Sequence, residues 1–171
     1  MAQKWRIKIA AVLGLILAVV QLYGGLWPIA TQTLRATHVA LGLGMAFMVY
    51  PFFKKKDGKP DLLSSKLMFV VDFLLTAGII LCCTYFITQL EALAYRGGNP
   101  STMDVVVSCV AVLLVLEACR RSLGAAMPII AVIFIVYAML GNLPGFLRHR
   151  VIDLEWLSTH LFLTTEGVFG T

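Results

Sequence analysis

The sequence predicts an all-α integral membrane protein: a bundle of four to five transmembrane helices plus a C-terminal interfacial helix. Apolar residues make up 60% of the 171 residues, charged residues only 13%, and the mean hydropathy is +0.89. Soluble domains carry about 25% charged residues, and a small water-soluble fold could not bury this much apolar surface. Intrinsic disorder is excluded as well, because it requires low hydrophobicity and high charge.

The long stretches without charged residues indicate where the transmembrane helices lie. Residues 9–34 and 122–147 contain no Asp, Glu, Lys or Arg, and residues 67–90 contain only Asp72. A helix needs about 20 residues to cross the hydrocarbon core, and a spanning segment must satisfy its own backbone amides. We therefore expect helices near residues 9–27, 36–53, 67–88, 102–119 and 126–143. The first apolar segment is too long for the hydrophobic core of a signal peptide and lacks a cleavage site. We therefore expect it to be kept in the mature protein as a transmembrane helix.

The distribution of Lys and Arg predicts the orientation. With the N-terminus in the cytoplasm, ten of the fourteen basic residues fall in cytoplasmic segments and four in external ones, as the positive-inside rule requires. Lys54, Lys55 and Lys56 follow the second predicted helix on the cytoplasmic side. Anionic lipid attracts each such residue by about 1 kcal/mol, so these lysines are expected to contact anionic lipid.

Asp72 is the acid that lies deepest within a predicted span. An ionised carboxylate in hydrocarbon is costly and needs a partner. We expect an interhelical pair with Arg120 or Arg121, which end the fourth helix at similar depth. Two alternatives are a carboxylate that reaches water or pairs with Lys66 and, with less support from one isolated acid, a role in proton or sodium coupling.

A second charged cluster is predicted where the fourth helix ends. Glu117 precedes Arg120 and Arg121 by three and four residues, so the three side chains share one helical face. Bases near a helix C-terminus also suit the helix dipole. The cluster is expected to be a structural lock at the membrane surface.

At the outer face, Ser101 and Asp104 have the spacing of a capping box that begins the fourth helix. Arg35 and His38 lie one turn apart at the start of the second helix, and Arg35 is expected to meet Asp104 or Glu91. Two residues one turn apart do not make a metal site. The same helix carries a face of small residues that would allow close helix packing: Ala36, Ala40 and Gly44.

Beyond the fifth predicted span, a run rich in Gly and Pro breaks the chain. Asp153 then has the character of an N-cap, and Leu154, Leu157 and Leu161 follow on one face. This segment is too short and too polar for a further crossing. An interfacial helix on the outer surface is the expected structure.

Several of these motifs resemble one known family. The sequence resembles the N-terminal region of the fused permeases of TRAP transporters, of the TAXI type, from about residue 35 to the end. The most specific matches are Glu117-Ala118-Cys119-Arg120-Arg121-Ser122-Leu123-Gly124 and Thr164-Thr165-Glu166-Gly167-Val168-Phe169-Gly170. Softer matches are Arg35-Ala36-Thr37-His38, Gly98-Asn99-Pro100-Ser101-Thr102-Met103-Asp104 and Tyr137-Ala138-Met139-Leu140-Gly141 with Pro144-Gly145.

The resemblance implies a non-catalytic scaffold or anchor in a secondary transporter for carboxylate-containing solutes, driven by an ion gradient, usually sodium. Residues 1–124 would form a small-subunit-like membrane domain, and residues 125–171 would lead toward the large transport unit. Implied partners are a large membrane subunit, a periplasmic substrate-binding protein and phospholipid, in a bacterial or archaeal cytoplasmic membrane. The chain stops before the large unit's helices, so it would be a separate small subunit or one piece of a longer permease.

No catalytic, metal-binding or cofactor-binding residue is expected, and Na⁺ would bind in the large unit. The residues expected to be structural or to form interfaces are Arg35, His38, Asp72, Asp104, Glu117, Arg120, Arg121 and Glu166. One alternative is the membrane anchor of a redox enzyme that binds quinone or haem through His38, although its partner would have to be His149 or His160 outside the membrane. Another is an autonomous channel or carrier, which would need polar groups deep in the bilayer.

Overall fold

The computed structural model describes residues 2–52, 62–96, 99–141, 145, 148–164 and 166–170. Helices occur at all five predicted spans and at the predicted interfacial segment. They are α1 (Ala2–Leu26), α2 (Thr31–Val49), α3 (Leu62–Arg96), α4 (Thr102–Ser122), α5 (Ala126–Leu140) and α6 (Leu154–Leu163). The all-helical prediction is therefore confirmed for the described part of the chain.

Three of the helices in the described ranges are long and apolar enough to cross a membrane: Lys4–Leu26, Lys66–Arg96 and Thr102–Ser122. This finding supports a membrane protein, while the predicted number of four to five crossings stays a prediction. Helix α5 has 15 residues and, at 1.5 Å per residue, is about 22 Å long. That length is short of the roughly 30 Å hydrocarbon core.

The chain divides into two compact units, Met1–Thr88 and Gln89–Thr171. The first contains α1, α2 and most of α3, and the second contains the end of α3 with α4, α5 and α6. The predicted division after residue 124 is a different one, drawn between a small-subunit-like domain and a connecting segment, and it stays a prediction.

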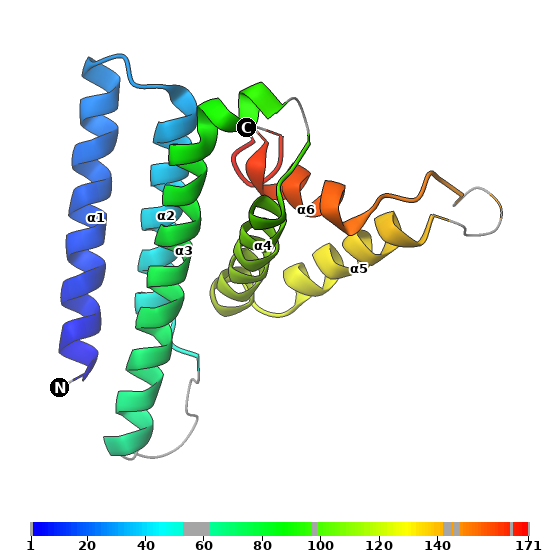
Figure 1. The fold of residues 1–171 in the computed structure, drawn as a ribbon. Coiled ribbons are helices and arrows are strands. Elements are labelled where there is room, and N and C mark those ends of the chain that lie inside the picture. Colours follow the sequence, from blue (N-terminus) through cyan, green and yellow to red (C-terminus); the bar gives the residue numbers. More distant parts are fainter. Residues whose placement is uncertain are drawn as a thin grey trace. The chain divides into compact units, whose positions relative to one another are not determined.

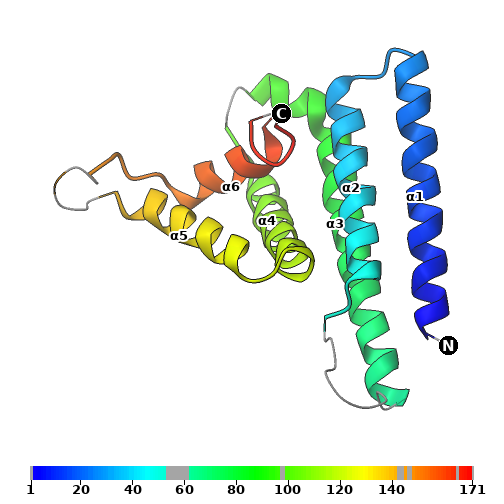
Figure 2. The ribbon, with the colours of Figure 1, turned by 180° about the vertical axis from the view of Figure 1, so that it is seen from behind.

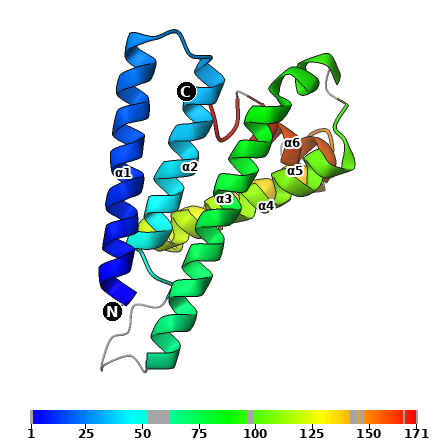
Figure 3. The same ribbon diagram turned by 60° about the vertical axis from the view of Figure 1, so that its left-hand side comes forward.

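Within the first unit, α1, α2 and α3 run side by side (Figures 1 and 3). The predicted face of small residues on α2 is confirmed, since Ala36, Ala40 and Gly44 are all buried. A Cβ added at Gly44 would lie 3.1 Å from Thr76 Cγ2 on α3 and 3.6 Å from Leu13 Cδ1 on α1. The missing side chain lets α2 approach both neighbours closely, as expected where apolar helices pack without a hydrophobic drive.

Within the second unit, α4 packs against both α5 and α6. Figure 2 shows α5 leading away from the end of α4 and the chain returning through α6. The return segment satisfies backbone carbonyls at the end of α5, which have no partner inside their own helix. The backbone N–H of Ile152 donates to Ala138 O at 3.2 Å, and that of His149 donates to Gly141 O at 3.1 Å.

Gly141 makes this return possible. Its φ is +46°, and a Cβ there would lie within 2.7 Å of the Val151 nitrogen. Only glycine adopts this conformation without strain and also leaves room for the passing backbone. Helix α5 therefore ends at Gly141 because of that residue's conformation.

Candidate functional site

The first candidate site is a buried ion pair between α1 and α3. Arg6 Nη2 lies 2.5 Å from Asp72 Oδ2, and the side chains are 11% and 0% exposed. The guanidinium carbon also lies 6.0 Å from the centre of the Phe69 ring, one turn before Asp72. An Arg is suited to such a position, because its fork of donors pairs with a carboxylate and its plane lies against an aromatic ring.

Thr76 extends this polar cluster by one turn of α3. Its hydroxyl donates to Asp72 O at 2.8 Å, and it also lies 3.3 Å from Gly44 O on α2. The three helices of the first unit thus meet around Asp72 through one ion pair and one hydroxyl. A cluster of this kind fixes the register of the helices, because sliding α1 along α3 would leave a buried charge without its partner.

The sequence prediction for Asp72 was incomplete. An interhelical partner was expected and is found, but Arg6 was not considered as that partner. The full burial of Asp72 contradicts the alternative in which its carboxylate reaches water. The expected pairing with Arg120 or Arg121 would join the two compact units and stays a prediction.

One sequence signal could have found the Arg6 pair. If the chain enters from the cytoplasm, α1 and α3 both begin on that side and run parallel. A basic residue in the first turns of α1 and an acid in the early turns of α3 then lie at comparable depth. Arg6 was expected to lie in a cytoplasmic segment before the first span, whereas the helix already begins at Ala2.

The second candidate site surrounds Asp104 at the start of α4. The predicted capping box is confirmed: Ser101 Oγ accepts from the backbone N–H of Asp104, and Asp104 Oδ2 accepts from that of Ser101 at 2.8 Å. The same carboxylate oxygen lies 2.5 Å from Arg96 Nη1 at the end of α3. Arg96 in turn donates to Gln89 Oε1 at 3.0 Å, so Asp104 connects two helix ends within the second unit.

Arg96 was not among the expected site residues, although it was the basic residue nearest in sequence to Asp104. Arg35 was expected to meet Asp104 or Glu91 instead. That pairing would join the two compact units and stays a prediction.

The third site is the charged cluster at the end of α4, where the predicted contact of Glu117 with Arg120 and Arg121 on one helical face is confirmed, while its role as a structural lock at the membrane surface stays a prediction. Glu117 accepts from Arg120 through two bonds of 2.8 and 2.9 Å and from Arg121 Nε at 2.6 Å. Arg120 is 41% exposed and Arg121 only 2% exposed. The carboxylate therefore holds one guanidinium at the surface and one in the interior.

His38 lies on α2 opposite α1. Its Nδ1 is 3.3 Å from Gln21 Nε2, and the side chain is exposed. Within the described residues, no three His, Cys, Asp or Glu side chains gather closely enough to hold a metal. Lys54, Lys55 and Lys56 lie outside the residues that the structure describes.

The C-terminal motif folds into a turn against α6. The backbone N–H of Val168 donates to Leu161 O at 2.7 Å, and the rings of Phe162 and Phe169 pack with centres 5.1 Å apart. A Cβ at Gly167 would collide with the Leu161 carbonyl, so the turn requires glycine. Glu166 itself is 76% exposed, with His160 Nε2 at 3.7 Å.

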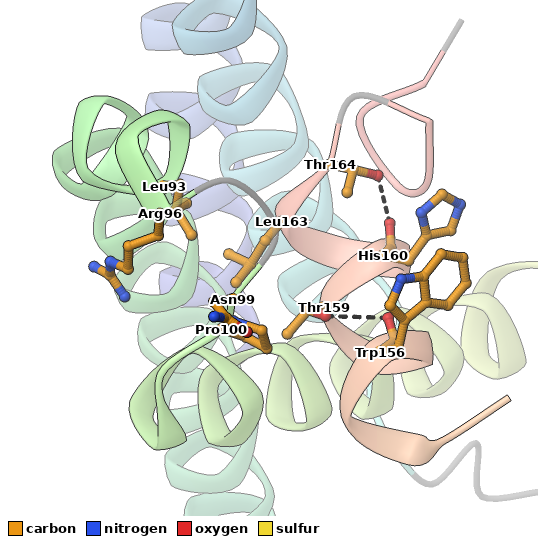
Figure 4. Close-up of a pocket in the computed structure, with 9 residues that line it drawn as sticks. All are labelled: Leu93, Arg96, Asn99, Pro100, Trp156, Thr159, His160, Leu163 and Thr164. Atoms are coloured by element: carbon orange, nitrogen blue, oxygen red, sulfur yellow. Dashed lines mark hydrogen bonds between the residues drawn. The ribbon is translucent and has the colours of Figure 1, made fainter.

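A cavity of about 180 Å³ lies in the second unit between α6 on one side and the end of α3 with Asn99 and Pro100 on the other (Figure 4). Trp156 and His160 stack at 4.6 Å on one side of it, and Arg96 points away from them. The hydroxyl of Thr159 donates to carbonyls of its own helix, as does that of Thr164. These two hydroxyls are thus used to hold α6 and its end.

The three charged sites share one property. In each, a carboxylate forms an ion pair with an arginine that lies near the end of a helix. The distances are those of charge-assisted hydrogen bonds. The Arg6–Asp72 and Arg96–Asp104 pairs position two helices relative to one another, whereas the Glu117 cluster lies within α4. Comparison with protein-family models, with curated proteins and with solved structures gives no match to this chain.

Proposed function

We propose that the chain is the non-catalytic membrane scaffold of a TRAP-type secondary transporter of the TAXI branch, which takes up carboxylate-containing solutes. In this role it holds a large membrane subunit, or the continuation of its own polypeptide, which binds solute and ions and moves. A periplasmic substrate-binding protein delivers the solute. The proposal combines the family resemblance of the sequence with the way the chain uses its charges.

The proposal is supported mainly by a contrast: the buried acids are paired with arginines, whereas the apolar helix faces are largely exposed. Asp72 and Asp104 are fully buried and paired with arginines. By contrast, only 6% of the residues in the most apolar stretch of α1 are buried. Apolar faces of this extent suit contact with lipid and with another membrane protein, whereas midplane transport sites are built from broken helices and unpaired polar groups.

In the proposed orientation the N-terminus lies in the cytoplasm, and the membrane is the bacterial or archaeal cytoplasmic membrane. The Arg6–Asp72 pair and the Glu117 cluster then lie toward the cytoplasmic side, and the Asp104 cluster and α6 lie toward the outside. Lys54, Lys55 and Lys56 would contact anionic lipid.

The test is association and transport with the natural partner. Affinity-tagged chain purified from its own membranes in mild detergent is expected to carry a second, larger membrane polypeptide, or to be part of one. Cells that lack the chain should lose sodium-dependent uptake of a carboxylate from a panel of such solutes, and the intact gene should restore it. Uptake that is unchanged without the chain would refute the proposal.

Orientation has its own test. A cysteine engineered beside Lys55 should react with a membrane-impermeant maleimide only after the cells are opened. Reaction in intact cells would reverse the proposed topology. An optical spectrum of the purified chain addresses the redox-anchor alternative, because haem bands would favour a role for His38 in ligation.

A further inference from the structure

The segment before α6 and the first turn of α6 combine exposed positive charge with an exposed tryptophan. Arg148 and Arg150 are exposed, and no ion pair of either guanidinium occurs within the part of the chain that the structure describes. Trp156 is 53% exposed, and Val151 is 44% exposed. Basic residues beside exposed apolar and aromatic side chains are typical of a surface at the level of lipid head groups.

The segment is held in a fixed shape by the end of α5. His149 places Nε2 at 2.9 Å from Tyr137 O and Nδ1 at 2.7 Å from Arg150 O, and its ring packs on that of Tyr137 with centres 4.5 Å apart. The backbone bond from Ile152 to Ala138 O fixes the next turn. The side chains of this segment are therefore presented from an anchored backbone.

A cavity of about 530 Å³ lies along this segment, and Arg150, Asp153 and Trp156 are among the residues that line it. Asp153 is the N-cap of α6 but makes no capping hydrogen bond with its side chain. Glu155 lies in the first turn of α6 as well, so the positive end of the helix dipole already faces two acids. The positive charge available to an anion therefore comes from Arg150, which lines the cavity, and from neighbouring Arg148.

The basic segment is hydrogen-bonded to the end of an apolar helix. Helix α5 exposes Phe134 at 65% and Leu140 at 56%, and the backbone N–H of His149 donates to Gly141 O just past the end of that helix. Tryptophan is enriched at the level of lipid head groups, and arginine pairs with phosphate through two parallel bonds. Acyl chains along α5 and a phosphate beside Arg150 would satisfy both parts of this surface.

We infer that the segment from Arg148 to Trp156 is a binding site for the head group of a membrane phospholipid. Arg150 and Arg148 bind the phosphodiester, Trp156 packs against the glycerol region, and the acyl chains follow the exposed face of α5. The inference rests on the membrane location but not on the proposed transporter role, so the site can be tested apart from any partner.

The test uses the full chain in micelles, with Trp5 and Trp27 replaced by Phe so that only Trp156 emits. Titration with a phospholipid brominated on its acyl chains should quench this fluorescence in a saturable manner, near one lipid per chain. Diacylglycerol with the same brominated chains lacks the phosphate and should quench only weakly and without saturation. Equal quenching by both lipids would overturn the inference.

Charge variants make the test specific. Loss of a charge-assisted hydrogen bond should weaken the lipid about tenfold in Arg150→Gln, while Arg150→Lys should retain most of the affinity. Lys66→Gln removes an exposed charge elsewhere and is the matched control, expected to bind as the parent does. An unchanged affinity in the Arg148→Gln/Arg150→Gln double variant would contradict the inference, as would displacement of the lipid by millimolar inorganic phosphate, which would identify a free anion as the occupant.

Discussion

Arg6 near the start of α1 lies 2.5 Å from Asp72 on α3, and the carboxylate is fully buried. The two residues are distant in sequence, and no local pattern joins them. Their contact makes the N-terminal turn of the chain part of the folded unit. The first prediction follows from this pair.

Arg6→Gln should destabilise the protein by about 3–5 kcal/mol, because it leaves the Asp72 carboxylate buried without its partner in α1. The free energy of unfolding, measured in mixed micelles, reports the change. Lys4→Gln removes an exposed charge from the same turn and should change stability little. In a double-mutant cycle, Arg6→Gln and Asp72→Asn should couple by about 0.5–3 kcal/mol, and strictly additive effects would show that the pair contributes nothing.

The small face of α2 gives the second prediction. Gly44→Val should cost about 1–3 kcal/mol through overpacking against Thr76 and Leu13. Gly42 lies on the same helix with open space around its Cα, so Gly42→Val is the matched control and should have a smaller effect. Equal losses in the two variants would mean that helix propensity, and not close packing, sets the cost.

The capping box at α4 gives the third prediction. Ser101→Ala removes the side chain that accepts from the Asp104 amide and should cost about 0.5–2 kcal/mol. The loss should be accompanied by faster hydrogen exchange in the first turn of α4. Thr102→Ala, one residue along and exposed, is expected to leave both quantities nearly unchanged.

The fourth prediction concerns the C-terminal turn. Gly167→Ala should disrupt the turn, because the added methyl group meets the Leu161 carbonyl. The amide of Val168, which donates to that carbonyl, should then exchange with solvent faster. Gly25→Ala, where a Cβ has nothing within 4 Å, is the control. A protected Val168 amide in Gly167→Ala would show that the turn forms by other contacts.

Local patterns were the part of this protein that could be predicted from sequence. The capping box of Ser101 and Asp104, the Glu117 cluster and the small face of α2 each depend on residues within about two turns of one helix, and each is confirmed. Helix existence was predicted at every span, because hydropathy and charge gaps report it directly. The predicted positions of the helix ends were less accurate, because α1 begins earlier than expected and α3 extends to Arg96.

Contacts between distant segments were harder to predict. Arg6 and Arg96, which pair with the buried acids, were expected in segments outside the membrane spans, whereas they lie within α1 and α3. The return of the chain onto the end of α5 depends on the φ of Gly141 and on carbonyls of Tyr137 and Ala138. A pattern of apolar residues carries no information about such backbone bonds.

We propose that this chain supports transport without performing it. Reconstitution into vesicles tests this directly: the flux of a carboxylate solute is measured in sodium-free vesicles diluted into sodium buffer, which gives an inward sodium gradient, and in sodium-loaded vesicles in the same buffer, which have no gradient. The chain alone should give no flux above that of empty vesicles, and the complex with its large membrane partner, supplied with the substrate-binding protein, should give sodium-dependent flux. Saturable solute flux from the chain alone would contradict the account.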